Sequence, residues 1–262
     1  MMGGGMGESR TSGELDYPLY LVNGRTPDAP ETLAVRRGDK VRLRLINPAS
    51  ETSFRFAVGG HKLTVTHADG LSVEHVTVDA LSVEMGERYE VLVEADNPGA
   101  WQAAAAAEGE DGMARAALRY EESGERSTPA ADLAPKEMDG KLLSYEALRT
   151  ADRESFPSGE PDCPLELTLA GGHGEYVWAI NDQLYPDADP LEVSKGEWVR
   201  LNVQNASMIA HPMRLHGHFF QVENGTDRGP YKDTATVGVH DSLNLDFVAD
   251  NPGDWLFHCH NL

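Results

Sequence analysis

The sequence has no long apolar run, few cysteines and little positive charge, and each shortage excludes a class of protein. No segment approaches the ~18 consecutive apolar residues that a membrane-spanning helix requires. Only 2 of the 262 residues are cysteine, which is too few for a disulfide scaffold. Lysine and arginine number 22 against 43 aspartates and glutamates, giving a formal net charge of −21. Nucleic-acid binding is therefore not expected, because it needs a basic surface to neutralise phosphates.

The acidic excess runs through both halves of the chain rather than forming one acidic tail. Carboxylates spread in this way repel one another, and strong salt screens that repulsion, because the Debye length falls to ~3 Å at 1 M. We hypothesise that the protein comes from a salt-loving (halophilic) source. The alternative is an ordinary acidic protein.

The chain begins with a glycine-rich segment that has neither the basic region nor the apolar region of a signal peptide. We interpret residues 1–15 as a flexible start.

One half of the sequence repeats the other at domain length. Three segments of the first half recur in the same order in the second half. The matched pairs are 33–39 with 191–197, 41–47 with 199–205, and 95–101 with 249–255. Two copies of this length indicate a duplicated domain rather than a solenoid.

Each copy has the pattern of short β-strands. Val41, Leu43 and Leu45 alternate with arginines, which predicts a half-buried strand. Similar alternating segments follow, separated by Gly, Pro, Asn and Asp turns. Strands at this spacing are typical of antiparallel Greek-key sandwiches. We therefore predict an all-β chain made of two sandwiches.

A proline-rich stretch separates the two copies. It sets the predicted boundaries: a first domain over 16–125, a linker over 126–162 and a second domain over 163–262. We expect a single helix over Lys141–Arg149. Although Cys163 is the first residue of the second domain by these bounds, it stands beside a proline, and we interpret it as an ordinary small residue that continues the linker.

The residues that suggest chemistry gather in the second copy. One cluster of histidines spans residues 211–218, and the other is His258, Cys259 and His260. A thiolate flanked by imidazoles suits copper or zinc, but zinc fingers space their ligands differently. In an extended strand His258 and His260 point to one face and Cys259 to the other. A single strand can therefore serve two metal centres.

The first copy provides an internal control for these ligands. Aligned on the repeat, the positions of residues 258–260 hold Ala104, Ala105 and Ala106, and the position of His211 holds Phe54. The fold therefore does not need the histidines and the cysteine for packing.

At these motifs the second copy resembles the C-terminal cupredoxin domain of laccase-like multicopper oxidases, whose patterns are H-P-x-H-x-H-G-H and H-C-H-x3-H-x4-M. The first copy resembles the copper-free middle domain of that family, including the segments Arg25–Pro27 and His67–Gly70. The resemblance implies two cupredoxin-like Greek-key sandwiches joined by the linker, with copper as the cofactor.

The resemblance also implies a role for each ligand. His211 and Cys259 would bind the type 1 copper, which receives electrons from a phenolic or metal-ion donor. His216, His258 and His260 would hold the type 3 copper pair, where dioxygen is reduced to water. The links from Cys259 to His258 and to His260 would carry electrons between the centres.

Three departures from the family pattern bear on activity. Arg214 stands where the family has the histidine of the type 2 copper, and a guanidinium has no lone pair to offer a metal. The second type 1 histidine and the axial methionine would lie beyond Leu262. No other His-x-His pair precedes His216, so we expect this chain to lack the domain that supplies the remaining ligands. We expect a fragment holding the middle and last domains of a three-domain oxidase, inactive alone, with a possible partner chain supplying the rest.

Two other functions remain open. One is a copper-free cupredoxin-fold scaffold or binding protein, which Arg214 favours. The other is a copper carrier without redox turnover. The resemblance implies an extracellular, cell-surface or periplasmic location. His218 completes the first cluster but is expected to be structural. The remaining histidines show no ligand spacing and are expected to be surface or turn residues: His61, His67, His75, His173 and His240.

Overall fold

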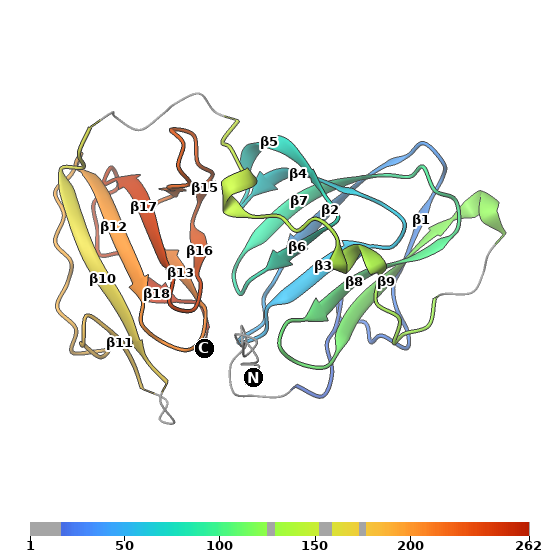
Figure 1. Ribbon diagram of the computed structural model, residues 1–262, viewed down its shortest axis with the longest axis horizontal. Helices are drawn as coiled ribbons and strands as arrows, with labels where there is room; N and C mark the ends of the chain where they lie inside the picture. The colour runs from blue at the N-terminus through green and yellow to red at the C-terminus, as the bar shows by residue number, and fades with distance from the viewer. Residues whose placement is uncertain (1–16, 125–128, 152–158, 173–176, 262) are drawn as a thin grey trace, which may run out of the picture.

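The chain folds into two β-sandwiches that lie side by side (Figure 1). The computed structural model describes residues 17–124, 129–151, 159–172 and 177–261. The predicted flexible start, 1–15, lies outside these residues. The all-β prediction is confirmed, because helical structure in the described residues is confined to three short 3₁₀ turns: η1 (Glu121–Ser123), η2 (Lys136–Asp139) and η3 (Tyr145–Ala147). None of these turns is long or apolar enough to cross a membrane.

The N-terminal sandwich consists of a five-stranded and a four-stranded sheet. In spatial order, the first holds β1 (Thr32–Val35), β9 (Met113–Tyr120), β8 (Ala100–Ala107), β3 (Phe54–Val58) and β6 (Ala80–Val83). The second holds β2 (Lys40–Ile46), β7 (Arg88–Glu94), β4 (Leu63–Ala68) and β5 (Leu71–Val78).

The C-terminal sandwich consists of a six-stranded and a three-stranded sheet. The first holds β11 (Trp178–Ile180), β10 (Cys163–Gly171), β12 (Trp198–Asn205), β17 (Ser242–Val248), β14 (Phe220–Val222) and β15 (Tyr231–Lys232). The second holds β16 (Thr234–Val237), β13 (His211–Leu215) and β18 (Phe257–Cys259).

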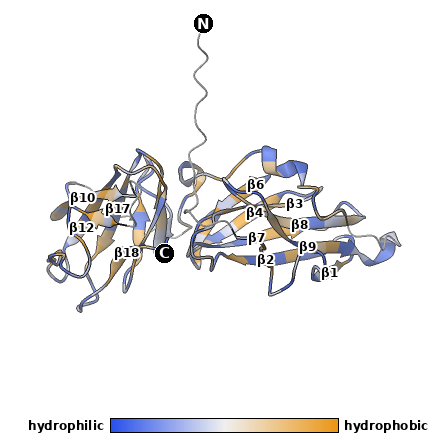
Figure 2. Cartoon of the chain, turned by 90° about the horizontal axis from the view of Figure 1, so that it is seen from below, coloured by the Kyte–Doolittle hydropathy of each residue, from blue (hydrophilic) through white to orange (hydrophobic). Residues whose placement is uncertain are grey.

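Period-two alternation accounts for how the strands pack. In β2, Val41, Leu43 and Leu45 pack against the core of the N-terminal sandwich. The alternate residues Arg42 and Arg44 point outward to Glu90 on β7, at 3.4 and 3.1 Å. Apolar residues lie along the strands of both sandwiches and polar residues predominate in the loops (Figure 2).

The sequence repeat recurs in three dimensions. In the N-terminal sandwich the indole N–H of Trp101 donates to the carbonyl of Asn97 at 2.8 Å. In the C-terminal sandwich Trp255 donates in the same way to Asn251 at 2.7 Å. Each pair closes the Asn-Pro-Gly turn that leads into the corresponding strand, so the two copies share local geometry as well as sequence.

The described part of the linker packs against the N-terminal sandwich, and two predictions about it are wrong. No helix forms over Lys141–Arg149, because Leu142 bridges to Ala80 and Thr150 bridges to Val73, which leaves only the turn η3 between them. Cys163 is not a linker residue. It begins β10 and lies in parallel register with Val199 of β12.

Candidate metal centre

Strands β13 and β18 bring the two histidine clusters together. They pair antiparallel, with Met213 opposite Cys259 and Arg214 opposite His258. The side chains of Cys259 and His258 leave β18 on opposite sides, as the alternation predicts. The strand therefore borders two different groups of histidines.

On one side, Cys259 lies against His211. The Sγ atom is 3.4 Å from Nδ1 of His211, and Nε2 of His211 is 2.7 Å from the hydroxyl of Ser207. That hydroxyl donates to Oδ1 of Asn205 at 2.8 Å, so it accepts a hydrogen bond from Nε2–H. The lone pair of His211 is then on Nδ1, facing the sulfur.

Burial sets the charge of this pair. It lowers the pKa of His211 to about 4 and raises the pKa of the Cys259 thiol to about 11. At neutral pH the imidazole is therefore uncharged and free to bind a metal, while a metal that binds sulfur must displace the thiol proton.

On the other side, His258 lies against His216. Their Nε2 atoms are 3.0 Å apart and their rings are stacked with centroids 5.1 Å apart. Nδ1 of His258 donates to the carbonyl of Cys259 at 2.7 Å, which leaves its lone pair on Nε2. Burial lowers the pKa of His258, and the neighbouring His216, His260 and Arg214 lower it further. His258 is therefore uncharged at neutral pH, with the lone pair of Nε2 facing His216.

His260 extends this side toward the N-terminal sandwich. Its ring centroid is 5.7 Å from that of His258, and its backbone N–H donates to the carbonyl of Pro212 at 2.7 Å. Its ring packs directly on Gly86, where an added Cβ would lie 2.7 Å from Cδ2 of His260. The N-terminal sandwich thus forms one wall of the histidine cluster.

Arg214 belongs to an ionic network rather than to a ligand set. Its guanidinium donates to Asp233 at 3.1 Å and to the hydroxyl of Thr234 at 3.0 Å. Arg88 of the N-terminal sandwich binds the same carboxylate through two hydrogen bonds of 2.6 and 2.8 Å. Although burial opposes ionisation, Arg88 holds the pKa of Asp233 below its ordinary value.

A second ion cluster lies at the same junction. The ammonium of Lys232 is fully buried, 3.0 Å from Asp69 and 3.1 Å from Glu87 of the N-terminal sandwich. Although burial disfavours its charge, the two carboxylates raise the pKa of Lys232 above its ordinary value. Sequence reasoning missed these contacts. The only signal was the His67–Gly70 segment, which contains Asp69.

The ligand set is incomplete within the described residues, where no three His, Cys, Asp or Glu side chains converge as a metal site.

The histidine that ends the first cluster, His218, packs edge-on against Trp255 and accepts a long 3.4 Å hydrogen bond from the N–H of Asn251. It supports the turn, as expected. His173 lies outside the described residues.

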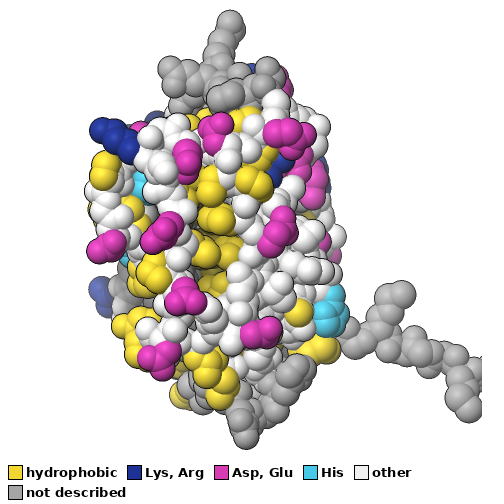
Figure 3. All heavy atoms as spheres, turned by 90° about the vertical axis from the view of Figure 1, so that its left-hand side faces the viewer, with side chains coloured by type: hydrophobic (Ala, Val, Ile, Leu, Met, Phe, Trp, Pro, Cys, Tyr) yellow, Lys and Arg dark blue, Asp and Glu magenta, His cyan; other side chains and the backbone are white. Residues whose placement is uncertain are grey.

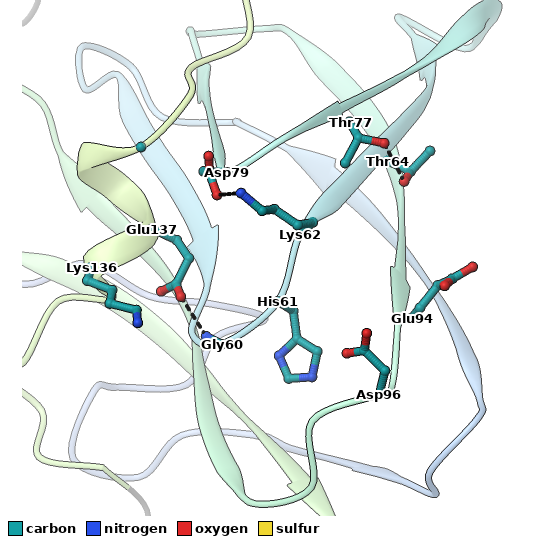
Figure 4. Close-up of a pocket in the computed structure, with 11 residues that line it drawn as sticks. Gly60, His61, Lys62, Thr64, Thr77, Asp79, Glu94, Asp96, Lys136 and Glu137 are labelled. Carbon is teal, nitrogen blue, oxygen red and sulfur yellow. Dashed lines mark hydrogen bonds and ion pairs between the residues drawn. The ribbon is translucent and has the colours of Figure 1, made fainter.

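A separate open pocket of about 740 Å³ lies on the N-terminal sandwich (Figure 4). Several of its charged side chains are already engaged: Lys62 is paired with Asp79, and Glu137 accepts a hydrogen bond from the N–H of Gly60 at 2.9 Å. His61 is held by the carbonyl of Gly59 and the hydroxyl of Tyr120. The pocket lies away from Cys259 and the histidine pairs, and it suggests no chemistry of its own.

Comparison with known proteins identifies the family to which the chain belongs. Two family models described as multicopper oxidase match residues 7–123 and 159–262. The chain is 39% identical over 250 residues to "Multicopper oxidase MmcO" of Mycobacterium tuberculosis, covering 95% of the chain and 49% of the relative. It is 30% identical to "Laccase-4" of Thanatephorus cucumeris, covering 92% of the chain and 53% of that protein.

The fold matches solved structures of the same kind. The laccase from Botrytis aclada superposes with a TM-score of 0.70 at 23% identity, covering 89% of this chain and 51% of the laccase. The expected cupredoxin-like architecture is confirmed by this likeness. The chain spans about half the length of the curated relatives it matches.

Proposed function

Because this chain belongs to the multicopper oxidase family, we propose that it forms the middle and C-terminal domains of a copper-dependent oxidase. The whole enzyme would take electrons from a phenolic or metal-ion donor and reduce dioxygen to water. The observation that carries this proposal is the placement of Cys259 beside His211 and of His258 beside His216, on opposite sides of one strand.

The donor atoms fit copper. A thiol and an imidazole lone pair 3.4 Å apart are the soft and borderline donors that copper prefers, and two imidazole nitrogens meet on the other side. In this assignment His211 and Cys259 hold the type 1 copper, and His216, His258 and His260 hold part of the type 3 pair. Copper bound there supplies one-electron chemistry.

The remaining residues orient these donors. Ser207 fixes the tautomer of His211, and the carbonyl of Cys259 fixes that of His258. The covalent link from Sγ of Cys259 through its backbone to His258 joins the two groups without a solvent gap. These residues prepare a path for electrons from one side of β18 to the other.

Arg214 leaves the set of ligands short of one imidazole. It is charged, hydrogen-bonded to Asp233 and unable to bind a metal. We propose that the missing ligands come from elsewhere in a larger protein or from a partner chain, and that this chain does not reduce dioxygen alone.

Free imidazole in place of the missing type 1 histidine provides a test. Adding Cu²⁺ and imidazole to the anaerobic protein should produce the visible thiolate-to-copper absorption of a His₂Cys site. Cys259→Ser should abolish the band, whereas Cys163→Ser, at the other free cysteine, should retain it. Absence of the band, or its survival in Cys259→Ser, would overturn the assignment.

A copper-free scaffold is the second candidate, and the position of Arg214 favours it. This side chain joins the network between the sandwiches through Asp233, which is a structural role. A chain that takes up no copper would fit the scaffold. Uptake without the thiolate band would fit a copper carrier.

We further propose a location outside the cytoplasm and a salt-loving source. The proposed location rests on the family alone. The proposed salt-loving source rests on the net charge of −21. Thermal unfolding in increasing NaCl tests the salt-loving source, because screening of the repulsion between carboxylates should raise the melting temperature from low to multimolar salt. An unchanged or lower melting temperature would contradict it.

A further inference from the structure

An aromatic contact recurs at equivalent positions of the two sandwiches. In the N-terminal sandwich the rings of Tyr20 and Phe54 meet edge to face, with centroids 5.2 Å apart and planes 85° apart. In the C-terminal sandwich the rings of Trp178 and His211 meet in the same way, at 5.3 Å and 77°. Both geometries are ones that aromatic pairs favour. The second contact joins the candidate type 1 histidine to a residue outside the two ligand motifs.

The sequence repeat aligns these two pairs. Trp178 follows Tyr20 at the same offset that separates the first pair of repeated segments, and Phe54 is the counterpart of His211. The contact is therefore present in the sandwich that has no candidate ligands as well as in the one that has them.

The chain just after the two aromatic residues agrees with this alignment. In the N-terminal sandwich, Val22 and Arg25 exchange backbone hydrogen bonds of 3.2 and 2.8 Å. In the C-terminal sandwich, Ile180 and Gln183 exchange equivalent hydrogen bonds of 3.1 and 3.0 Å. The contact thus belongs to the duplicated scaffold, and in the second copy an imidazole occupies the place of a phenyl ring.

An imidazole that binds a metal needs more from this contact than a phenyl ring does. The torsion about the Cβ–Cγ bond is broad and roughly two-fold, and a half turn of a phenyl ring returns the same shape. The same turn of His211 would carry Nδ1 away from Sγ of Cys259, at 3.4 Å, and Nε2 away from the hydroxyl of Ser207, at 2.7 Å. The ring of Trp178 packs against the imidazole and restricts that turn.

The backbone at the end of β10 holds the indole in its turn. Trp178 begins β11 and lies opposite Gly171, the last residue of β10. The indole lies directly on Gly172, where an added Cβ would be 2.4 Å from Cη2 of Trp178. These two strands form one face of the molecule, on which apolar side chains gather within a border of acidic ones (Figure 3). Because the glycine has no side chain to separate the indole from the backbone, strand pairing sets the position of the indole.

We propose that Trp178 is a positioning residue for the candidate type 1 copper. It holds the imidazole of His211 in the plane that directs Nδ1 at Cys259, so the nitrogen and the sulfur face the metal together. Groups that orient a metal-binding imidazole commonly change metal affinity by roughly 10–100-fold. This inference rests on the proposed copper function, and Trp178 itself binds no metal.

The orientation of His211 can be measured without copper. Its Nε2–H donates to the hydroxyl of the buried Ser207, so this proton should exchange slowly with water and give its own NMR resonance. In Trp178→Leu the exchange rate of this proton should rise at least about tenfold, because the imidazole is freer to turn. Trp178→Phe keeps an aromatic partner and should retain the slow exchange.

The same variants are then titrated with Cu²⁺ in the presence of imidazole, and the thiolate-to-copper absorption is followed. Trp178→Leu should weaken copper binding by about 10–100-fold, whereas Trp178→Phe should stay within about threefold of the unaltered chain. Tyr20→Leu is the matched control, because it removes the same contact from the sandwich without candidate ligands. Its copper affinity should equal that of the unaltered chain.

A second pair of variants moves the indole without changing any aromatic residue. Gly172→Ala places a methyl group against the indole of Trp178, and the φ of +79° adds backbone strain. Gly196→Ala has a similar φ of +91° but open space around it, so it carries the strain alone. The Nε2–H of His211 should exchange faster in Gly172→Ala and at the unaltered rate in Gly196→Ala.

Two results would overturn the proposal. One is an unchanged exchange rate of the His211 Nε2–H in Trp178→Leu or, should that variant not fold, in Gly172→Ala. The other is an equal loss of copper affinity in Tyr20→Leu and Trp178→Leu, which would make the effect one of general stability. If no chain develops the thiolate band, the proposed function fails, whereas the metal-free measurement still decides whether Trp178 positions His211.

Discussion

His216 and His258 are 42 residues apart in the chain, yet their Nε2 atoms are 3.0 Å apart. The pairing of β13 with β18 produces this contact, since it sets Arg214 opposite His258 and aligns the two histidine motifs. A single strand pairing thus assembles the candidate site, and the position of Arg214 within that pairing decides how many imidazoles are present.

Replacing Arg214 tests whether its position is a vacated metal site. Arg214→His should increase copper affinity at the His216–His258 side by about tenfold or more, since it adds a neutral donor beside the pair. Arg214→Lys keeps the positive charge without a free lone pair at neutral pH, so its affinity should not rise. Equal affinities of the two variants, by isothermal titration calorimetry, would contradict this interpretation.

Gly86 tests the contact between the N-terminal sandwich and His260. Its φ of +81° and the 2.7 Å approach to the imidazole mean that Gly86→Ala must both strain the backbone and move the ring. Gly124 also has a positive φ, of +66°, but open space around it, so Gly124→Ala suffers only the backbone cost of about 1–2 kcal/mol. The ring resonances of His260 in NMR spectra should shift in the first variant alone. Shifts in neither variant or in both would contradict the packing.

Lys232 tests the ion cluster between the sandwiches. Lys232→Met leaves Asp69 and Glu87 buried without their cation, so the free energy of unfolding should fall by about 3–5 kcal/mol at neutral pH. Burial already raises the pKa of Asp69 and the charge of Lys232 opposes that rise, so without Lys232 the pKa of Asp69 rises further in the folded state. The loss of stability should therefore shrink as pH falls and Asp69 takes up a proton. The exposed pair of Lys40 and Glu94 provides the control, and Lys40→Met should cost at most about 1 kcal/mol in urea titrations. If the two variants lose the same free energy of unfolding, the buried ion cluster does not contribute to stability as proposed.

The burial of Glu84 should make the stability of the fold depend on pH. Burial, and secondarily the charge of Glu87, raises the pKa of Glu84 from 4.5 to about 8. Between these values the folded chain keeps a proton that the unfolded chain has lost, so this residue's contribution to stability falls as pH rises from 4.5 to 8. Glu84→Gln should stabilise the protein at pH 8 by roughly 2–4 kcal/mol and change little at pH 4. Glu160 is exposed, so Glu160→Gln should change the free energy of unfolding at neither pH. If the two variants show the same dependence of stability on pH, Glu84 does not have this role.

The strands and the ligand contacts were predictable because they follow from local alternation. Val41, Leu43 and Leu45 define a core face wherever the strand lies, and adjacent residues of β18 must point to opposite sides. The sequence also indicated that residues 211–218 accompany residues 258–260. Their contact across two paired strands agrees with that expectation, while their roles as copper ligands remain predictions.

The junction between the sandwiches was not predictable in the same way. Asp69 and Lys232 lie in different domains, and no periodicity relates a carboxylate in one turn to a lysine that far along the chain. The helix predicted over Lys141–Arg149 was wrong for a related reason. Leu142 and Thr150 bridge to strands of the N-terminal sandwich, and these tertiary contacts override the local helix preference.

Copper bound per chain, counted after competition with a chelator, tests most directly whether β18 serves two centres. Cys259→Ser should remove the copper on the His211 side and leave the other, while His216→Ala should do the reverse. His75→Ala, an exposed histidine of the N-terminal sandwich, should bind as the unaltered chain does. If Cys259→Ser and His216→Ala both retain the full complement of copper, or both lose the same ion, the two sides of β18 do not hold separate metals.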